Sequence, residues 1–187
     1  MSEWQQHVDS VLKEILIDEE TLQKRIAELG AEITADYTKE NVDDLLVIGI
    51  LKGSVVFMSD LLRHLEMPVS IDFMITKSYD GSVTTGEINV IKDISESITG
   101  KHVLIVEDII DTGLTLKCLR NLLKERKPAS LKICTLLSKP DRRKVELEAD
   151  YTGFVIPDEF IVGMGLDIDG HYRQLPYIGT LKPEVYE

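Results

Sequence analysis

The sequence predicts an α/β fold in which a mostly parallel central sheet is flanked by helices. Runs that resemble strands alternate with helical patterns along the chain, as parallel sheets require. Most of these runs are apolar throughout, which is typical of strands covered on both faces. The chain has 187 residues, 43% of them apolar, and can bury a sizeable core. No repeat or linker divides it, so we expect a single domain over residues 1–187.

The first predicted elements are a long helix, a strand and a second helix. Asp18–Lys39 combines an acidic first turn with an apolar stripe at helical spacing, so this helix should pack on the sheet. The stripe consists of Leu22, Ile26, Leu29, Ile33 and Tyr37. Leu45–Leu51 is a continuous apolar run and predicts a buried strand. Val55–Leu65 then follows a helical pattern, which Met67-Pro68 closes.

An alternating strand and a returning strand are predicted next. Val69–Lys77 alternates and should turn one apolar face to the core. That face consists of Val69, Ile71, Phe73 and Ile75. Ser78–Gly86 is polar and rich in turn residues, so Ile88–Ile94 can pair back on the preceding strand.

Two further apolar strands enclose a helix. His102–Glu107 and Leu131–Leu137 are the strands, and Thr115–Arg126 is the helix between them. Cys118 lies on the apolar stripe of this helix, and Cys134 lies inside the second strand. Two cysteines do not make a disulfide framework, so we expect both to be buried thiols of a reducing compartment.

Charge and hydropathy exclude several classes of function. A net charge of −12 argues against binding to nucleic acids or anionic membranes, both of which favour a basic face. No apolar run is long enough to span a membrane, and Glu3 and Asp9 do not suit a signal peptide. We therefore expect a cytoplasmic protein that binds small molecules.

The most informative segment joins the apolar strand to the helix after it. Glu107 and Asp108 follow the strand, and Asp111 precedes Thr112-Gly113. Successive backbone NH groups, a glycine and two threonine hydroxyls suit a phosphate monoester, which the first two acids would repel. The loop and the acids can serve one ligand if its phosphate binds the loop and its hydroxyls, or a bound Mg²⁺, contact the acids. The segment therefore predicts a ribose 5-phosphate unit. The alternative is a solvated acidic turn in which Asp111 or Thr112 caps the helix.

Lys52-Gly53 provides a second candidate anion site. It follows the strand Leu45–Leu51, just as the acidic segment follows another strand. Ligands of open α/β sheets bind beyond the carboxyl ends of the strands, so the two segments can converge although they are far apart in sequence. The alternative is an ordinary strand-to-helix turn with a surface lysine.

The segment Glu107–Thr115 resembles the phosphoribosyl-pyrophosphate (PRPP) signature of the type I phosphoribosyltransferases. Six other motifs resemble the purine-salvage branch of that family, the hypoxanthine-guanine phosphoribosyltransferases. These are Leu51–Ser54, Lys77–Asp80, Ser138–Pro140, Phe154–Asp158, Val162–Asp167 and Tyr172–Gly179. The resemblance extends from about Ile15 to the end of the sequence. It implies the fold of that family, with a small hood formed by the N- and C-terminal segments.

The resemblance also implies how PRPP is bound. Ribose and its phosphate would contact Glu107, Asp108, Asp111, Thr112, Gly113, Leu114 and Thr115. Lys52, Gly53 and Arg173 would bind the pyrophosphate, beside a Leu51–Lys52 peptide that is often cis in this family. Mg²⁺ is the implied cofactor, with Glu107, Asp108 and Asp167 as its ligands. Leu114 departs from the members that carry a basic residue there.

The implied purine site consists of Lys139, Phe160, Ile161 and Asp167. Lys139 would donate to the 6-oxo group, which disfavours adenine because its amine is a donor. Ser78 and Tyr79 resemble the mobile lid of the family. Without the resemblance, a solvated lysine, a core phenylalanine and a flexible hairpin loop would explain these residues. Ile168 departs from the tyrosine common at this position.

The implied activity is transfer of the 5-phosphoribosyl group from PRPP to N9 of hypoxanthine or guanine, which gives IMP or GMP and pyrophosphate. Asp111 is the implied catalytic residue, accepting the proton of purine N7. The resemblance also implies a homodimer or homotetramer. Alternatives are a xanthine-accepting enzyme and a nucleotide-sensing regulator with the same fold. A receiver domain fits less well, because no later strand after Val103 ends in an acceptor aspartate.

Overall fold

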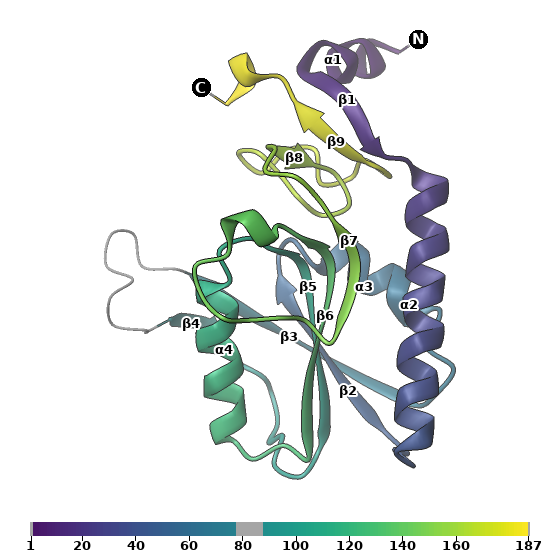
Figure 1. Cartoon of the computed structure of the whole chain (residues 1–187), viewed down its shortest axis with the longest axis vertical. Helices are drawn as coiled ribbons and strands as arrows, with labels where there is room; N and C mark the ends of the chain where they lie inside the picture. Colours follow the sequence, from purple (N-terminus) through teal and green to yellow (C-terminus); the bar gives the residue numbers. More distant parts are fainter. Residues whose placement is uncertain (1, 78–87, 187) are drawn as a thin grey trace.

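The computed structural model describes residues 2–77 and 88–186, which form two sheets joined by helices and loops (Figure 1). The larger sheet has six strands in the order β4-β3-β2-β5-β6-β7. Their bounds are Leu45–Leu51 for β2, Val69–Lys77 for β3, Asn89–Lys92 for β4, His102–Ile110 for β5, Ser130–Ser138 for β6 and Tyr151–Val155 for β7. All neighbours are parallel except β3 and β4, which are antiparallel. The predicted mostly parallel sheet is confirmed.

Helices cover both faces of this sheet, as Figure 1 shows for α2 and α4. On one face, α2 (Glu19–Lys39) and α3 (Val55–Leu62) pack over a core that contains the whole predicted stripe of α2. Asp18 caps α2 by accepting a hydrogen bond from the Thr21 amide over 2.8 Å. On the other face, α4 (Leu114–Glu125) packs over a second core.

The two ends of the chain build a hood above the carboxyl ends of the central strands (Figure 1). It contains α1 (Glu3–Val11) and a three-stranded antiparallel sheet in the order β1-β9-β8. These strands are Leu12–Ile17 for β1, Ile161–Val162 for β8 and Ile178–Leu181 for β9. Two 3-10 helices, η1 (Pro140–Arg142) and η2 (Pro183–Val185), complete the described elements. The hood predicted from the terminal segments is confirmed.

Two element boundaries differ from the prediction. Helix α3 ends at Leu62 rather than Leu65, because the Arg63 amide already bonds back to Asp60 and Leu61. Strand β5 continues to Ile110, three residues beyond its predicted end, because it pairs with β6 as far as Ser138. Glu107 and Asp108 are therefore strand residues.

The predicted apolar face of β3 is only partly buried: Val69 and Phe73 pack against the core, but Ile71 does not. Ile71 is 53% exposed, whereas Met74 on the opposite face is fully buried. Strand β4 pairs only with the last residues of β3, so the part that carries Ile71 lies at an open edge. The strand Ile88–Ile94 was predicted to pair back on β3, and its central residues do so as β4.

The two cysteines have different surroundings. Cys134 is fully buried, as predicted, but Cys118 is only half-buried because it lies at the margin of the α4 stripe. Within residues 2–77 and 88–186, the helices are too short or too polar to cross a membrane.

Candidate active site

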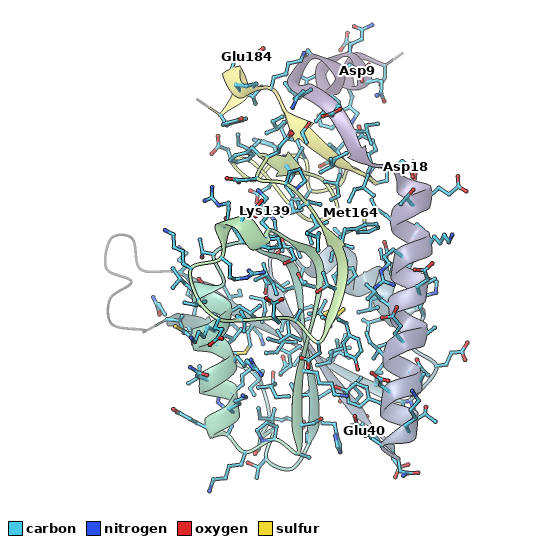
Figure 2. All side chains as sticks on the ribbon, viewed as in Figure 1. Asp9, Asp18, Glu40, Lys139, Met164 and Glu184 are labelled. Carbon is cyan, nitrogen blue, oxygen red and sulfur yellow. The ribbon has the colours of Figure 1, made fainter. Side chains whose placement is uncertain are left out.

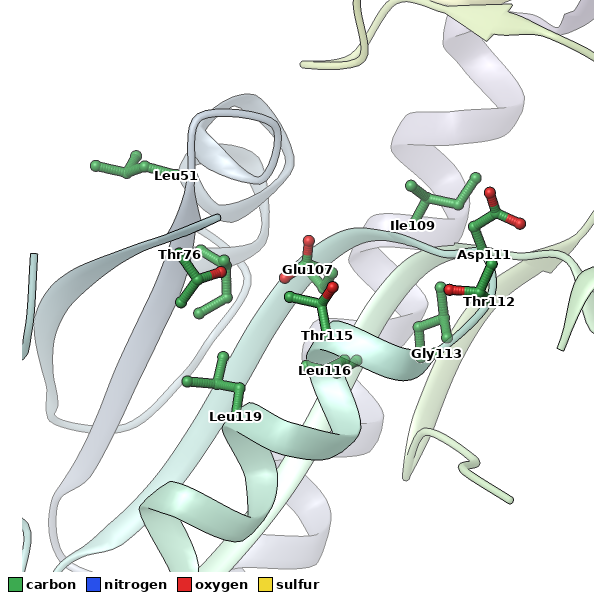
Figure 3. Close-up of a pocket in the computed structure, with 12 residues that line it drawn as sticks. Leu51, Thr76, Glu107, Ile109, Asp111, Thr112, Gly113, Thr115, Leu116 and Leu119 are labelled. Carbon is green, nitrogen blue, oxygen red and sulfur yellow. The ribbon is translucent and has the colours of Figure 1, made fainter. Parts of the chain in front are cut away.

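A cavity of about 260 Å³ opens where β2 and β5 end and α4 begins. We call it the loop cavity, because the loop Asp111–Gly113 forms one wall. In Figure 3, the side chains of Glu107 and Thr115 lie between this loop and Thr76 on β3. Leu51 also lines the cavity, and Gly53 lies against the Asp108 carboxylate, so the ends of β2 and β5 lie side by side here, although Lys52 and Gly53 do not line the cavity.

The loop between β5 and α4 directs a helix start toward the loop cavity. Gly113 has a φ of +77°, a left-handed conformation that glycine adopts without a steric penalty. This conformation turns the chain so that α4 begins at once, at Leu114. The first amides of a helix have no carbonyl partner within the helix, and its N-terminus carries partial positive charge. The loop cavity therefore has a wall suited to an anion.

The segment after β6 supports this loop. The Arg143 guanidinium donates to the Asp111 carbonyl over 2.7 Å and to the Ser138 hydroxyl over 2.8 Å. The Lys144 amide donates to the Thr112 carbonyl over 3.0 Å. Arg143 follows the 3-10 helix η1 directly, and no sequence pattern marked it as a support of the loop.

Asp111 forms an ion pair that was also missed. Arg142 Nε lies 2.7 Å from Asp111 Oδ1, and Arg142 Nη1 lies 3.4 Å from Asp158 Oδ2. The two carboxylates raise the pKa of Arg142, so it stays cationic beside Asp111. The sequence signal for this contact was the position of Arg142, four residues after Ser138 at the carboxyl end of β6.

Glu107 and Asp108 place two carboxyl groups in a buried setting at the floor of the site. Burial raises the pKa of Glu107 well above its ordinary value, and the adjacent Asp108 raises it further. Burial also raises the pKa of Asp108, although Glu107, the Ile109 amide and Arg173 act in the opposite direction. The Ile109 amide donates to Asp108 Oδ1 over 2.8 Å. Without a cation, the pair favours a shared proton over two negative charges.

Two glycine-containing segments meet beside these acids. The Leu51–Lys52 peptide is cis, as the resemblance implied, and leads into Gly53. A Cβ at Gly53 would overlap the Asp108 carboxylate, and a Cβ at Gly165 would overlap the Gly53 carbonyl. Gly165 also has a φ of +100°, which favours glycine. The backbones pack too closely here for any side chain, while the Lys52 side chain itself is exposed.

Asp167 and Arg173 pair with each other. Arg173 Nη2 lies 2.6 Å from Asp167 Oδ1, and the Gly170 amide donates to Asp167 Oδ2 over 2.7 Å. Arg173 also donates to the Gly165 carbonyl. Glu107, Asp108 and Asp167 were predicted to share a metal ion. Across the described residues, no three His, Cys, Asp or Glu side chains gather closely enough to form a ready ligand set.

A second cavity, of about 430 Å³, adjoins the first. We call it the aromatic cavity, because Phe160 and Tyr186 line it. All four predicted purine-binding residues also line it: Lys139, Phe160, Ile161 and Asp167. Asp111 and Ile109 line both cavities, so the two adjoin at these residues.

Lys139 is a buried lysine at the level where the two sheets meet (Figure 2). It is 8% exposed, and its Nζ donates to the Glu159 carbonyl over 2.6 Å. The Asp158 carboxylate lies 3.7 Å from the same atom. Because an ammonium group has three donor hydrogens, Lys139 keeps the capacity to donate to a ligand in the aromatic cavity.

The rings of Phe160 and Tyr186 stack at the edge of the aromatic cavity. Their centroids are 4.8 Å apart, and the planes are inclined by 16°. Tyr186 was not among the predicted site residues, because nothing in the sequence links it to Phe160. The predicted lid residues Ser78 and Tyr79 lie outside the described residues.

Comparisons with known proteins agree with this geometry. Residues 14–169 match the family of the phosphoribosyl transferase domain. A hypoxanthine-guanine phosphoribosyltransferase of Staphylococcus aureus is 55% identical over 176 residues, which cover 94% of this chain and 97% of the relative. The enzyme of that name from Streptococcus pneumoniae is 49% identical over 180 residues, with coverages of 96% and 98%. A crystal structure of a hypoxanthine phosphoribosyltransferase from S. aureus matches over all of both chains, with a TM-score of 0.92 and 52% identity.

Proposed function

The chain belongs to the phosphoribosyl transferase family, and we propose that it transfers the 5-phosphoribosyl group from PRPP to N9 of hypoxanthine or guanine in purine salvage. The products would be IMP or GMP and pyrophosphate. The observation that carries this proposal is the junction of the two cavities at Asp111. One cavity suits a sugar phosphate, the other suits a flat base, and a carboxylate stands between them.

The loop cavity would hold the ribose 5-phosphate. The phosphate would accept hydrogen bonds from the start of α4 and from the hydroxyls of Thr112 and Thr115. Glu107 and Asp108 would contact the ribose hydroxyls. Arg143 supports this assignment, because its bonds to Asp111 and Ser138 hold the loop in place before any ligand arrives.

The aromatic cavity would hold the purine. Lys139 Nζ would donate to the 6-oxo group, and the Phe160 ring would stack on the base. Ile161 would present backbone groups to the base edge, beside Asp167. Burial of Lys139 supports selectivity for a 6-oxopurine over adenine. The adenine amine is itself a donor, so a buried ammonium group that faces it would have no acceptor.

Asp111 would act as the general base. Cleavage of the bond between C1′ and pyrophosphate places positive charge on the ribose, and purine N9 then forms the new bond to C1′. The proton on N7 would pass to the Asp111 carboxylate. Arg142 supports this role through position, since its Nε lies 2.7 Å from Oδ1 and holds the carboxylate where the two cavities adjoin. No protein nucleophile is required.

The leaving pyrophosphate would be stabilised by cations beside the close contact between Gly53 and Gly165. Lys52, the Gly53 amide and Arg173 would bind it. The acid pair Glu107 and Asp108 fits Mg²⁺, because burial and mutual repulsion raise their pKa values and a divalent cation offsets both effects. Asp167 would be the third acid at this ion. When bound, Mg²⁺ would neutralise charge on the pyrophosphate.

Two further parts of the proposal rest on family resemblance. Ser78 and Tyr79 would belong to a lid that closes over the reacting groups, and the enzyme would assemble as a homodimer or homotetramer. The cysteine usage of the sequence favours work in the cytoplasm. Small molecules, namely PRPP and a 6-oxopurine, would be its ligands, and the net charge of −12 favours neither nucleic acid nor anionic membrane as a partner.

The experiment is pyrophosphate release from PRPP with Mg²⁺, with hypoxanthine, guanine, xanthine and adenine offered separately. We expect turnover with hypoxanthine and guanine but not with adenine. Efficient turnover with xanthine would instead identify a xanthine-accepting enzyme. Nucleotide binding without turnover of any base would reject the transferase in favour of a regulator with this fold.

A further inference from the structure

We propose that Tyr186 is a positioning residue of the purine site, which holds the Phe160 ring in the orientation that receives the base. The inference rests on the proposed role of Phe160 in stacking on the purine. Tyr186 would form the outer layer of a three-layer stack, Phe160 the middle layer, and the base the inner layer. Tyr186 would thus act through Phe160 without touching the base.

The first observation is how little else holds the Phe160 ring. It is 39% exposed, and it belongs to none of the three hydrophobic cores formed by the described residues. Tyr186 stacks on it with centroids 4.8 Å apart. An exposed ring on a loop samples several rotamers, and ordering it on binding costs conformational entropy. A stacked partner reduces that cost before the ligand binds.

The second observation is that the backbone fixes the two rings relative to each other. The Leu181 amide donates to the Phe160 carbonyl over 2.9 Å, which ties the Phe160 loop to the end of β9. The chain then enters η2, where the Tyr186 amide donates to the Pro183 carbonyl over 3.1 Å. The Lys182 amide bonds to the Val11 carbonyl and anchors η2 to the hood. Tyr186 therefore reaches Phe160 from a hydrogen-bonded segment.

The third observation concerns which face of Phe160 is available. Tyr186 covers one face of the Phe160 ring, and both side chains line the aromatic cavity. At 4.8 Å between centroids, no base fits between the two rings. A purine that also reaches Lys139 must therefore use the opposite face of Phe160. Both Lys139 and Phe160 line the aromatic cavity, which supports this arrangement.

The test compares steady-state kinetics of Tyr186→Ala, Tyr186→Phe and the control Glu184→Ala, which alters the same segment at an exposed side chain. We expect Tyr186→Ala to raise the KM for guanine about threefold to tenfold, the usual range for losing one aromatic pair. The kcat and the KM for PRPP should stay unchanged. Tyr186→Phe should behave like the parent, because stacking needs the ring and not the hydroxyl.

A double variant separates a positioning role from direct contact. If Tyr186 acts through Phe160, Phe160→Ala combined with Tyr186→Ala should have the same KM for guanine as Phe160→Ala alone. Effects that multiply would mean that Tyr186 touches the base, which would overturn the proposal.

Two other results would also reject it. An unchanged KM in Tyr186→Ala would mean that the stack does not matter, and a lower KM would mean that Tyr186 occupies the place of the base. If Phe160→Ala left the KM for guanine unchanged, Phe160 would lose its stacking role and the present inference would fail with it. Pyrophosphate release with the four bases judges the transferase activity separately.

Discussion

Asp111 is the residue at which the two cavities meet, and its surroundings suit a proton acceptor. Arg142 lies 2.7 Å from Oδ1, while Arg143 holds the backbone carbonyl of the same residue over 2.7 Å. One arginine therefore holds the side chain of Asp111, and the other holds its backbone. A carboxylate held in this way needs little reorganisation when it accepts the N7 proton of the purine.

We expect Asp111→Asn to lower kcat by ~10²–10⁴, the usual contribution of one positioned acid or base. The amide keeps the shape of the side chain but cannot accept the N7 proton. Steady-state kinetics with guanine and PRPP measure the effect, and Asp141→Asn serves as a control on the neighbouring exposed surface. A kcat close to that of the parent would remove Asp111 from the mechanism.

Glu107 leads to a prediction about pH and stability. Burial raises its pKa above the ordinary 4.5, so the folded protein binds a proton more tightly than the unfolded chain does. This contribution to stability is complete below the ordinary pKa and is lost as pH rises through the raised value. In the presence of EDTA, the Tm of the ligand-free protein should fall as pH rises from the ordinary value of 4.5 through the raised pKa of Glu107.

Replacing Glu107 with Gln should flatten that fall and raise the Tm at the alkaline end, because the amide carries no charge to repel Asp108. Thermal unfolding followed by circular dichroism measures the Tm of each variant across the pH range. Glu148→Gln, at an exposed position, is the control. If Glu107→Gln retained the pH slope of the parent, Glu107 would not be the titrating group.

At the scale of elements, α2 contains a glycine where a helix would ordinarily favour alanine. Gly30 faces the end of α3, and a Cβ there would lie 2.6 Å from the His64 carbonyl oxygen and closer still to the His64 Cβ. The missing side chain lets α2 approach the chain that leaves α3. This approach also brings the Thr34 hydroxyl within 3.1 Å of the Glu66 amide, which donates to it.

We expect Gly30→Ala to lower the Tm by several degrees. Alanine gains about 1 kcal/mol of helix propensity, but forcing a methyl group into packed backbone costs about 1–3 kcal/mol. Lys24→Ala, on the exposed face of the same helix, is the matched control. The kcat of the folded variant should not change, because Gly30 is remote from both cavities. A higher Tm would show that the helices can move apart without loss.

For the whole molecule, a net charge of −12 opposes an anionic substrate at long range. Attraction must come from a few cations near the site, namely Lys52, Lys139, Arg142 and Arg173. Salt screens distant charges more strongly than those in contact, with a Debye length of about 10 Å at 0.1 M. Added salt should therefore weaken the adverse field before it weakens the local contacts.

We expect kcat/KM for PRPP to change little or to rise when ionic strength increases from about 10 mM to about 150 mM at constant free Mg²⁺. The kcat/KM for the uncharged base hypoxanthine, at saturating PRPP, reports any general effect of salt on the enzyme. A steep fall confined to PRPP would contradict the prediction and indicate long-range attraction to a local positive field.

Much of the architecture could be predicted because its signals are local. The α2 stripe, the apolar runs of β2 and β6 and the turn at Gly113 each depend on neighbours within a few positions, where periodicity and backbone freedom act. Residues of the motif Glu107–Thr115 line the loop cavity, and the chemistry predicted for them stays a prediction. The exposed Ile71 was missed, because burial depends on which strand lies alongside.

The sequence by itself therefore determined the α/β class, the order of the elements and the chemical character of the acidic loop. Only the tertiary structure decided that Arg142 pairs with Asp111, that Lys139 is buried and that Tyr186 stacks on Phe160. The last contact joins two loops, and each of the three depends on how separate parts of the chain pack. Such contacts leave no periodic pattern, because they arise when strand order and the hood bring those parts together.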